Sequence, residues 1–553
     1  MKKYLFPTIT VLCLIVGFFL GNAIANRANA QQLRWGNFHI QLSKVDQLLQ
    51  YMQTAYVDSI DVDSITEDIM ADIVSHLDPH SAYIPKKDLE LVNSELSSSF
   101  SGIGVQFSIQ SDTVNIVAVI SGGPSEGVGI LAGDKIIEVN DSSFTGKGIN
   151  NEKVMHTLRG EKGTQVTLGV KRYGTSETLR FTVTRGDIPV HSVDAAFIIE
   201  PDGKSNKTTT HRSAHSSGQP KIGFVRVNKF SEKTYDEFIA ALARLKSEGA
   251  TAYIVDLREN SGGYMDQAIR MANEFLPAGD MIVYSQGRAY PKYEAKANGL
   301  GRFKSVPLVV LIDDFSASAS EIFAGAMQDN DRATIIGRRS FGKGLVQQQI
   351  PFSDGSAMRL TVARYYTPSG RCIQKPYELG KQTDYQKELI ERFEHGEMFS
   401  ADSIHMLDST LYYTKQGRRV FGGGGIMPDI FVGRDTSLNT PWFNLTVNRA
   451  LTYQFAYQYT DRNRKQLERY TSWQSLEQHL LKANWLPEFI RFAESKGVEP
   501  NQKEIEKSRP LLTRIINAYI VRNILGDEGF FPLFERDDNI TQRAVLFLSS
   551  EEQ

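Results

Sequence analysis

Three serines and one lysine between Asp313 and Gln349 are the residues best suited to chemistry in this sequence. The serines alternate with alanines over Ser316–Ser320, and the lysine lies between glycines in Gly342-Lys343-Gly344. Apolar residues at helical spacing follow the serines, which predicts that a helix begins there. Small side chains at a helix start leave backbone N–H groups unpaired, as an oxyanion site requires. We therefore expect a serine nucleophile with the lysine as its base.

The same residues have a simpler structural explanation. Ser318 and Glu321 stand three apart before apolar residues, which is the signature of a capping box that only starts a helix. Gly-Lys-Gly is also an ordinary surface turn. A lysine base further requires burial, because an ordinary lysine is protonated at neutral pH. Phe341 and Leu345 flank Lys343 and can supply apolar surroundings.

Several motifs, taken in order, resemble those of the carboxy-terminal processing proteases, tail-specific serine proteases that use a Ser-Lys dyad. They are LDPHSAYI at 77–84, SGIGVQF at 101–107, DLRENSGG at 256–263, SASASEIFAGAMQD followed by FGKGLVQQ, and GGGGIMPDI at 422–430. The resemblance covers most of residues 45–435. It implies Ser318 as the nucleophile, Lys343 as the base and Gln347 as a third polar member. It also implies that Ala319 and either Gly262 or Gly263 donate their amides to an oxyanion.

Two details of these motifs stay open. The family usually has Asn and Pro where this chain has Glu259 and Ser261, so the glycine that turns inward is undecided. In a strand, residues 343 and 347 would lie about 13 Å apart. We therefore expect a helix or turn over 343–347, which Gly344 permits. The alternative for Gln347 is a plain strand residue.

Length, charge and cysteine content limit the remaining possibilities. A chain of 553 residues has room for three or four domains of about 150 residues each. Its net charge of −2 argues against nucleic acid binding. Of the two cysteines, Cys13 lies in the N-terminal apolar run, so no disulfide framework is expected in the rest. Asp78 and His80 lack the further ligands of a metal site, and we expect neither metal nor cofactor.

The N-terminus has the order of a secretory signal peptide. Lys2 and Lys3 precede an apolar run over residues 4–20, and two A-x-A sequences follow. The run is near the lower limit for a spanning helix, so an uncleaved membrane anchor is the alternative. Both interpretations predict an exported protein, either periplasmic or anchored with its body outside the cytoplasm.

Sequence patterns predict a multidomain α+β and α/β protein. Residues 200–220 are polar and rich in Ser and Thr, which predicts a flexible loop. The resemblance implies a crotonase-like layered protease core and an N-terminal helical arm that helps to build a homodimer or higher oligomer. The segments are a leader (1–30), a helical N-terminal region (31–95), a β-rich domain (96–186), an α/β domain (187–435) and a helical C-terminal extension (436–553).

The β-rich segment resembles a PDZ domain in its order of strands and glycine turns. Gly102, Ile103 and Gly104 precede a strand, and consecutive amides in such a loop can hold a terminal carboxylate. A hairpin turn is the simpler explanation of this loop. Val154 and Leu158, one helical turn apart, are candidates for the peptide groove or for the core. The resemblance implies protein substrates with free, apolar C-termini.

Sequence and resemblance together favour an exported serine endopeptidase that captures a protein C-terminus and works through an acyl-enzyme. The alternative is a catalytically inactive PDZ protein that binds peptides or acts as a chaperone, which a missing Ser318 or Lys343 would have favoured. An acyl-CoA enzyme fits less well because of the Gly-Lys-Gly and PDZ-like segments. A Ser-His-Asp hydrolase is disfavoured because no histidine lies within 216–393. Arg159 either couples peptide binding to the site or is a solvated loop residue.

Overall fold

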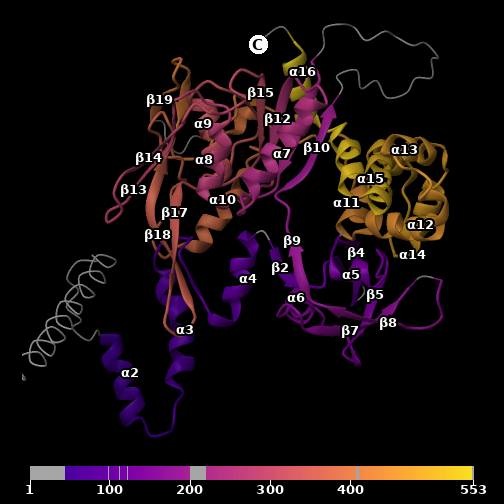
Figure 1. The fold of residues 1–553 in the computed structure, drawn as a ribbon, viewed down its shortest axis with the longest axis horizontal. Coiled ribbons are helices and arrows are strands. Elements are labelled where there is room, and N and C mark those ends of the chain that lie inside the picture. The colour runs from indigo at the N-terminus through magenta and orange to yellow at the C-terminus, as the bar shows by residue number, and fades with distance from the viewer. Residues whose placement is uncertain are drawn as a thin grey trace, which may run out of the picture. The chain divides into compact units, whose positions relative to one another are not determined.

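The computed structural model describes residues 44–97, 99–110, 112–120, 122–172, 174–199, 220–405 and 410–550 (Figure 1). The N-terminal leader and most of the predicted flexible loop lie outside these residues. The chain separates into two compact units after Met70. The described part of the first unit holds helix α2 (Lys44–Ala55) and the start of α3 (Val62–Ser75). The second unit begins at Ala71 and contains the remaining elements.

A small antiparallel unit follows helix α4 (Lys86–Leu96). Its main sheet has the order β3-β4-β5-β7-β8, with β6 paired to β5. Inward-facing residues such as Ile116, Ile136 and Leu168 form its core, as the two-residue period of strands requires. The elements are β2 (Ser99–Gly102), β3 (Val105–Gln110), β4 (Thr113–Val119), α5 (Pro124–Gly127), β5 (Lys135–Val139), β6 (Ser142–Ser143), α6 (Asn151–Leu158), β7 (Gln165–Lys171), β8 (Leu179–Thr184) and β9 (Gly186–Pro189).

A six-stranded sheet in the order β10-β11-β12-β15-β16-β21 forms the centre of the α/β part. Only its first pair, β10 with β11, is antiparallel. Strands β12 and β15 are buried at every residue, which explains their continuous apolar sequences. The elements of this sheet and its first helices are β10 (Val193–Ile199), β11 (Ile222–Val227), α7 (Thr234–Ser247), β12 (Ala252–Asp256), α8 (Met265–Asn273), β15 (Leu308–Ile312), α9 (Ala319–Asp329), β16 (Thr334–Gly337) and β21 (Ile430–Phe431).

Different helices cover the two faces of this central sheet (Figure 1). Helices α7, α8 and α9 pack on one face, where Phe238, Phe275 and Phe323 are fully buried. The opposite face packs against Ile540 and Ala544 of the last helix, α16 (Asn539–Ser549). The C-terminal extension therefore completes the core of the α/β part.

A second sheet is built around strand β18, which pairs with β1, β13 and β17. Strand β1 corrects the prediction of a helical region over residues 31–95, because residues 82–84 are extended and pair with β18. Helix α3 ends at Ser75, shortly before Asp78-Pro79, where proline disfavours a helical conformation of the preceding residue, and the β-favouring Tyr83 and Ile84 then add to the sheet. The elements are β1 (Ala82–Ile84), β13 (Met281–Gln286), β14 (Tyr293–Lys296), β17 (Leu345–Pro351) and β18 (Ala357–Tyr366).

Helices dominate the C-terminal part, as predicted, and the multidomain α+β and α/β fold is confirmed. Phe455, Phe489 and Ile516 belong to a separate core of these helices. No helix in the described ranges is long and apolar enough to cross a bilayer. The remaining elements are α10 (Gln382–Glu394), the 3-10 turn Ala401–Ser403, β19 (Leu411–Tyr413), β20 (Arg419–Phe421), α11 (Pro441–Asn448), α12 (Leu451–Leu467), α13 (Trp473–Lys482), α14 (Leu486–Ser495) and α15 (Gln502–Glu535), which is kinked at Gly526.

Candidate active site

Ser318 lies at the sharp turn between β15 and helix α9, which begins one residue later, as predicted. Its φ of 55° and ψ of −114° form a conformation that residues with a side chain rarely adopt. Neighbouring contacts hold this strained turn, since the Ala317 N–H and the Ser320 hydroxyl both donate to the Asn260 carbonyl. Ser316 and Ser320 are fully buried, whereas Ser318 is partly exposed. Of the three alternating serines, Ser318 is therefore the one that a substrate can reach.

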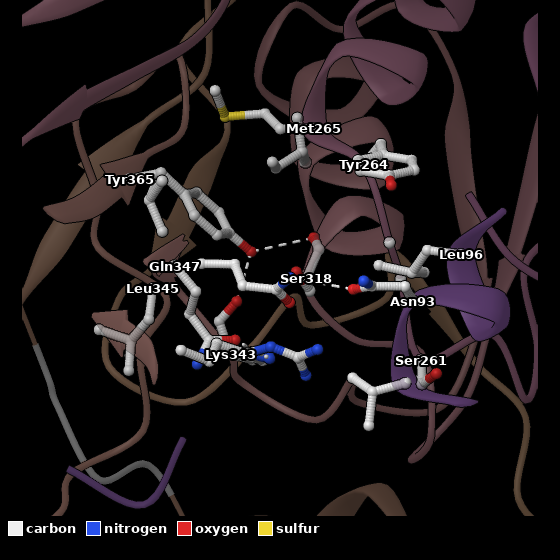
Figure 2. A pocket seen from close by; sticks show the side chains of 17 residues that line it. Asn93, Leu96, Ser261, Tyr264, Met265, Ser318, Lys343, Leu345, Gln347 and Tyr365 are labelled. Atoms are coloured by element: carbon white, nitrogen blue, oxygen red, sulfur yellow. Dashed lines mark hydrogen bonds between the residues drawn. The ribbon is translucent and has the colours of Figure 1, made fainter. Parts of the chain in front are cut away.

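Ser318 and Lys343 line the same pocket, which has a volume of about 460 Å³ (Figure 2). Gly262, Gly263 and Gln347 line it as well. These residues come from segments far apart in the sequence, and the structure brings them together. In the described residues no hydrogen bond joins the Ser318 hydroxyl to the Lys343 Nζ.

The Lys343 side chain has the surroundings that a lysine base needs. Burial lowers its pKa below the ordinary value, and the nearby positive charge of Arg359 lowers it further. Glu321 and Asp78 oppose this shift without reversing it. The lysine Nζ donates to Gln347 Oε1 at 3.0 Å. The amide of Gln347 thus orients the amine without adding a charge that would keep it protonated.

The prediction of a helix or turn over 343–347 is wrong, because strand β17 begins at Leu345. The Lys343 and Gln347 side chains nevertheless meet. Both side chains are long and span most of the distance between their backbones. A register shift between Val346 and Gln347 also changes the direction of the Gln347 side chain. The distance between the backbones of residues 343 and 347 therefore does not decide whether the two side chains can meet.

The loop after β12 passes directly over Ser318. A Cβ atom placed on Gly262 would lie 2.7 Å from Ser318 Cβ and 2.9 Å from the Ala319 nitrogen, so only glycine fits here. The Gly262 N–H already donates to Asn260 Oδ1 at 2.9 Å. Within the described chain, the amides of Gly263 and Ala319 have no protein acceptor. The geometry favours Gly263 over Gly262 as the partner of Ala319 in an oxyanion site.

Glu321 is a fully buried carboxylate that connects the serine turn to the lysine loop. One oxygen accepts from the Ser318 N–H at 2.8 Å and the Lys343 N–H at 2.8 Å. The other accepts from Ser340 Oγ at 2.5 Å and the Gly342 N–H at 2.7 Å. The capping-box pattern pointed to the first of these contacts, but nothing local in the sequence could reveal the other three.

Tyr365 is a second connecting residue, and sequence reasoning missed it. Its hydroxyl lies 3.0 Å from the Ser318 carbonyl oxygen and 2.5 Å from the Lys343 carbonyl oxygen (Figure 2). The side chain is almost completely buried, which raises the pKa of its hydroxyl well above the ordinary value and keeps it a donor. No local motif marks this tyrosine, because its partners lie 47 and 22 residues away.

The turn at Asp78 and His80 supports Gln347 from the other side. Asp78 accepts hydrogen bonds from the backbone amides of His80 and Ser81 and from the Thr361 hydroxyl. The His80 carbonyl in turn accepts from Gln347 Nε2, which directs Gln347 Oε1 toward the lysine. Burial and the charge of Lys343 lower the pKa of His80 to about 4, so this ring is neutral at pH 7. Asp78 and His80 therefore act as groups of the turn.

The predicted carboxylate loop borders a groove of about 310 Å³ between β3 and α6. Ile103 and Gly104 line it, whereas Gly102 ends β2 and pairs with Gly186. Leu158 lines the groove, but Val154 is fully buried in the core and does not. The apolar lining residues are Phe100, Ile103, Val105, Phe107, Met155 and Leu158.

Arg159 is not a solvated loop residue. Its guanidinium donates to Ser94 Oγ on α4 at 2.7 Å and lies 4.1 Å from the centre of the Phe100 ring. Both Phe100 and Arg159 line the groove, and α4 neighbours Asn93 and Leu96 line the Ser318 pocket. Arg159, at the end of α6 beside the groove, thus connects α6 to α4, which borders the Ser318 pocket.

Comparisons with known proteins place segments of this chain in known families. A sequence model described as peptidase family S41 matches residues 221–387, and one described as a PDZ domain matches residues 101–183. A third, described as a family of unknown function, matches residues 442–526.

Related proteins extend this likeness beyond single domains. A carboxy-terminal-processing protease of Bartonella bacilliformis is 34% identical over 66% of this chain and 80% of its own length. The carboxy-terminal processing protease CtpB of Bacillus subtilis is 31% identical over 62% of this chain and 68% of its own. A solved photosystem II D1 C-terminal processing protease is 27% identical, covering 60% of this chain and 83% of that one, with a TM-score of 0.35.

The fold and these relationships define a serine-type protease with an embedded PDZ domain. The chain belongs to peptidase family S41, among the carboxy-terminal processing proteases.

The reactivity of Ser318 should rise with pH as Lys343 loses its proton, at an apparent pKa below that of an ordinary lysine. A fluorophosphonate, which labels nucleophilic serines, reports this rate. Gln347→Glu places a negative charge beside the ammonium and should move the apparent pKa upward. The measurement is the labelling rate of both proteins as a function of pH.

Gln348→Glu is the matched control, because Gln348 is the next residue of the same strand and is exposed. It should leave the apparent pKa where it is in the native protein. A labelling rate independent of pH, or equal shifts in the two variants, would contradict the assignment of Lys343.

Tyr365→Phe removes the hydroxyl that lies between the serine and lysine segments. We expect kcat to fall about tenfold with little change in KM, since an unpaired buried carbonyl costs on the order of 1–2 kcal/mol. Steady-state peptide cleavage measures both constants. Tyr366→Phe, at the next residue of β18, is the control and should retain the native kcat. An equal loss of kcat in both variants would argue against a specific role of Tyr365.

Proposed function

We propose that this protease cleaves peptide bonds with a Ser318–Lys343 dyad and selects its substrates by their C-termini. The observation that carries the proposal is the shared pocket of a strained, reachable serine and a lysine whose pKa is lowered by burial. Either feature alone also occurs for structural reasons. Together they serve both requirements of serine catalysis, an accessible hydroxyl and a base that loses its proton more readily than an ordinary lysine.

In the proposed mechanism, the Ser318 hydroxyl attacks the scissile carbonyl while the Lys343 amine accepts its proton. Lys343 then gives that proton to the leaving amine, and an acyl-enzyme remains. Water hydrolyses this intermediate with the same lysine as base. The amides of Ala319 and Gly263 are placed to stabilise the oxyanion of each tetrahedral intermediate. Gln347 holds the amine between these steps through its side-chain oxygen.

The groove between β3 and α6 supports recognition of a peptide tail. An extended peptide can pair with β3, since strand addition satisfies the main-chain groups of both partners. The amides of Ile103 and Gly104, with Gly102 just before them, are the candidates to bind the terminal carboxylate. Val105, Phe107 and Leu158 line the groove with apolar side chains. An apolar last residue therefore suits this groove better than a charged one.

We also propose that the protein is exported and that it associates with copies of itself. Lys2, Lys3 and the apolar run over residues 4–20 have the order of an export signal, which is consistent with a protease kept apart from newly made proteins. In helix α2, Val45, Leu48 and Tyr51 are exposed apolar residues. Exposed apolar side chains of this kind support association into a homodimer or higher oligomer.

The test is turnover of an unfolded protein with an apolar C-terminal residue. Native enzyme should cleave it, and Ser318→Ala and Lys343→Ala should each lose at least about a thousandfold in rate, as expected for members of a catalytic unit. The same substrate with an amidated C-terminus should bind more weakly, because the groove amides lose a charged partner.

Circular dichroism should confirm that both variants are folded. Cleavage that survives in Ser318→Ala would assign the nucleophile to another serine. Binding of the tail without cleavage by the native protein would contradict the catalytic proposal. Equal affinity for the acid and amide tails would contradict carboxylate recognition.

A further inference from the structure

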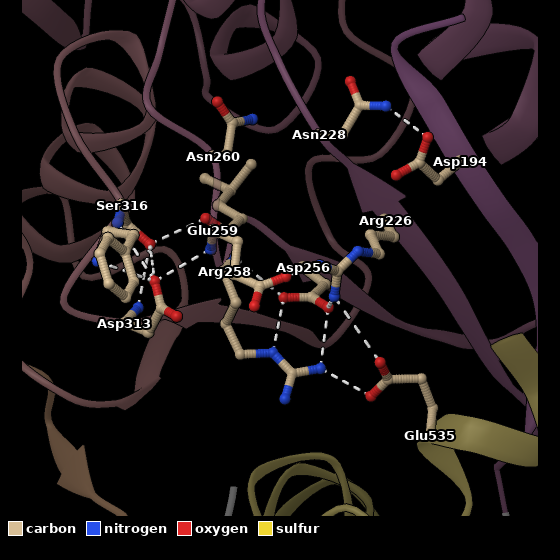
Figure 3. A network of polar contacts seen from close by, with 12 residues as sticks. Asp194, Arg226, Asn228, Asp256, Arg258, Glu259, Asn260, Asp313, Ser316 and Glu535 are labelled. Carbon is tan, nitrogen blue, oxygen red and sulfur yellow. Dashed lines mark hydrogen bonds and ion pairs between the residues drawn. The ribbon is translucent and has the colours of Figure 1, made fainter. Parts of the chain in front are cut away.

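The loop that supplies Gly263 follows strand β12, and its second residue is a buried arginine, Arg258. Its side chain points into a cluster of carboxylates that includes Asp256 and Glu535 (Figure 3). Only 7% of Arg258 is exposed to solvent. A buried guanidinium must be fully paired, so the positions of its partners constrain the start of the loop.

Three carboxylates surround Arg258, and two of them belong to the C-terminal extension. Arg258 Nε lies 2.8 Å from Asp256 Oδ1. Its Nη2 lies 2.6 Å from Glu535 Oε2, and its Nη1 lies 2.7 Å from Asp538 Oδ1. Glu535 ends α15 and Asp538 caps α16. Both residues follow the stretches that match the peptidase and unknown-function families, 221–387 and 442–526.

A second arginine, Arg226, links the carboxylate cluster to the next residue of the loop, Glu259. Arg226 Nη1 lies 2.9 Å from Asp256 Oδ2 and 3.6 Å from Glu535 Oε1. Its Nη2 lies 2.7 Å from the Glu259 carboxylate (Figure 3). The cluster therefore holds two consecutive loop residues, Arg258 and Glu259. The second of these has a φ of 61°, a strained conformation that needs such support.

The opposite side of the loop is held by the active-site turn. The Glu259 N–H donates to Asp313 Oδ1 at 2.9 Å, and the same carboxylate oxygen accepts from the Ser316 N–H. Asn260 Oδ1 accepts from the Gly262 N–H. The Gly262 carbonyl in turn accepts from the Phe230 N–H at 2.9 Å, which fixes the peptide group whose N–H, that of Gly263, is left for the pocket. The loop thus lies between a carboxylate cluster and the serine turn.

We propose that the C-terminal extension positions the oxyanion loop, through the contacts of Glu535 and Asp538 with Arg258. The two carboxylates are positioning residues, because neither lines the pocket that holds Ser318. The inference rests on the proposed function in one respect, the use of the Gly263 amide by an oxyanion. The inference gives the C-terminal extension a role in catalysis. The sequence does not reveal this role, because the extension lies far along the chain from the Ser318 and Lys343 motifs.

Glu535→Gln tests this role, because it keeps the size of the side chain and removes its charge. We expect kcat to fall by about tenfold through displacement of the loop, with KM and tail affinity unchanged. Backbone amides of residues 257–264 should exchange hydrogen faster in this variant. Steady-state cleavage, tail binding and hydrogen exchange with mass spectrometry measure the three effects.

Glu477→Gln is the matched control, because Glu477 forms a 2.8 Å ion pair with Arg536 in the same extension. It should leave kcat and the exchange of residues 257–264 at native values. Asp538→Asn is a second test, since asparagine can still cap α16 at Thr541. It should reproduce the Glu535→Gln effects even where the latter variant folds poorly.

The outcomes separate this inference from the proposed function. Native kcat and native exchange in both Glu535→Gln and Asp538→Asn would overturn the inference and leave the proposed function standing. Equal losses in Glu477→Gln would overturn it too, since the effect would then be a general loss of stability. Failure of the native protein to cleave would refute the proposed function, while the exchange of residues 257–264 would still decide whether the extension holds the loop.

Discussion

The active site depends on one buried carboxylate, that of Glu321. It accepts hydrogen bonds from the backbone N–H groups of Ser318 and Lys343 and therefore ties the serine turn to the lysine loop. Burial raises its pKa, and the donors from Ser318, Ser340, Gly342 and Lys343 oppose that effect. A buried carboxylate left without these donors would be costly, so the two segments have to stay together around it. The strained backbone of Ser318 is retained for the same reason.

The central sheet explains why these segments meet. Strands β12, β15 and β16 are parallel neighbours, and their carboxyl ends lie along one edge. The oxyanion loop follows β12, the serine turn follows β15 and the lysine loop follows β16. Sites in α/β folds form at this edge because every strand delivers a loop there. Helices α7 to α9 bury one face of this sheet, and the C-terminal α16 buries the other.

Local sequence patterns predicted the elements and part of the site. Helix α9 follows from the helical spacing of its apolar residues, and the glycines around Lys343 marked its loop. Patterns could not predict Tyr365, whose role depends on two distant carbonyls, or the contacts that Glu535 makes across the fold. The error over 343–347 came from treating a side-chain contact as a backbone distance. Long-range contacts depend on packing, which a local pattern does not contain.

The most direct test of this account is the reactivity of Ser318 in Glu321→Gln. The glutamine amide group has one acceptor oxygen and cannot accept all four hydrogen bonds, so the serine and lysine segments should lose their common anchor. The account predicts that a fluorophosphonate labels this variant about a hundredfold more slowly than the native protein, while circular dichroism shows a folded chain. Labelling of the folded variant at the native rate would contradict the claim that Glu321 assembles the site.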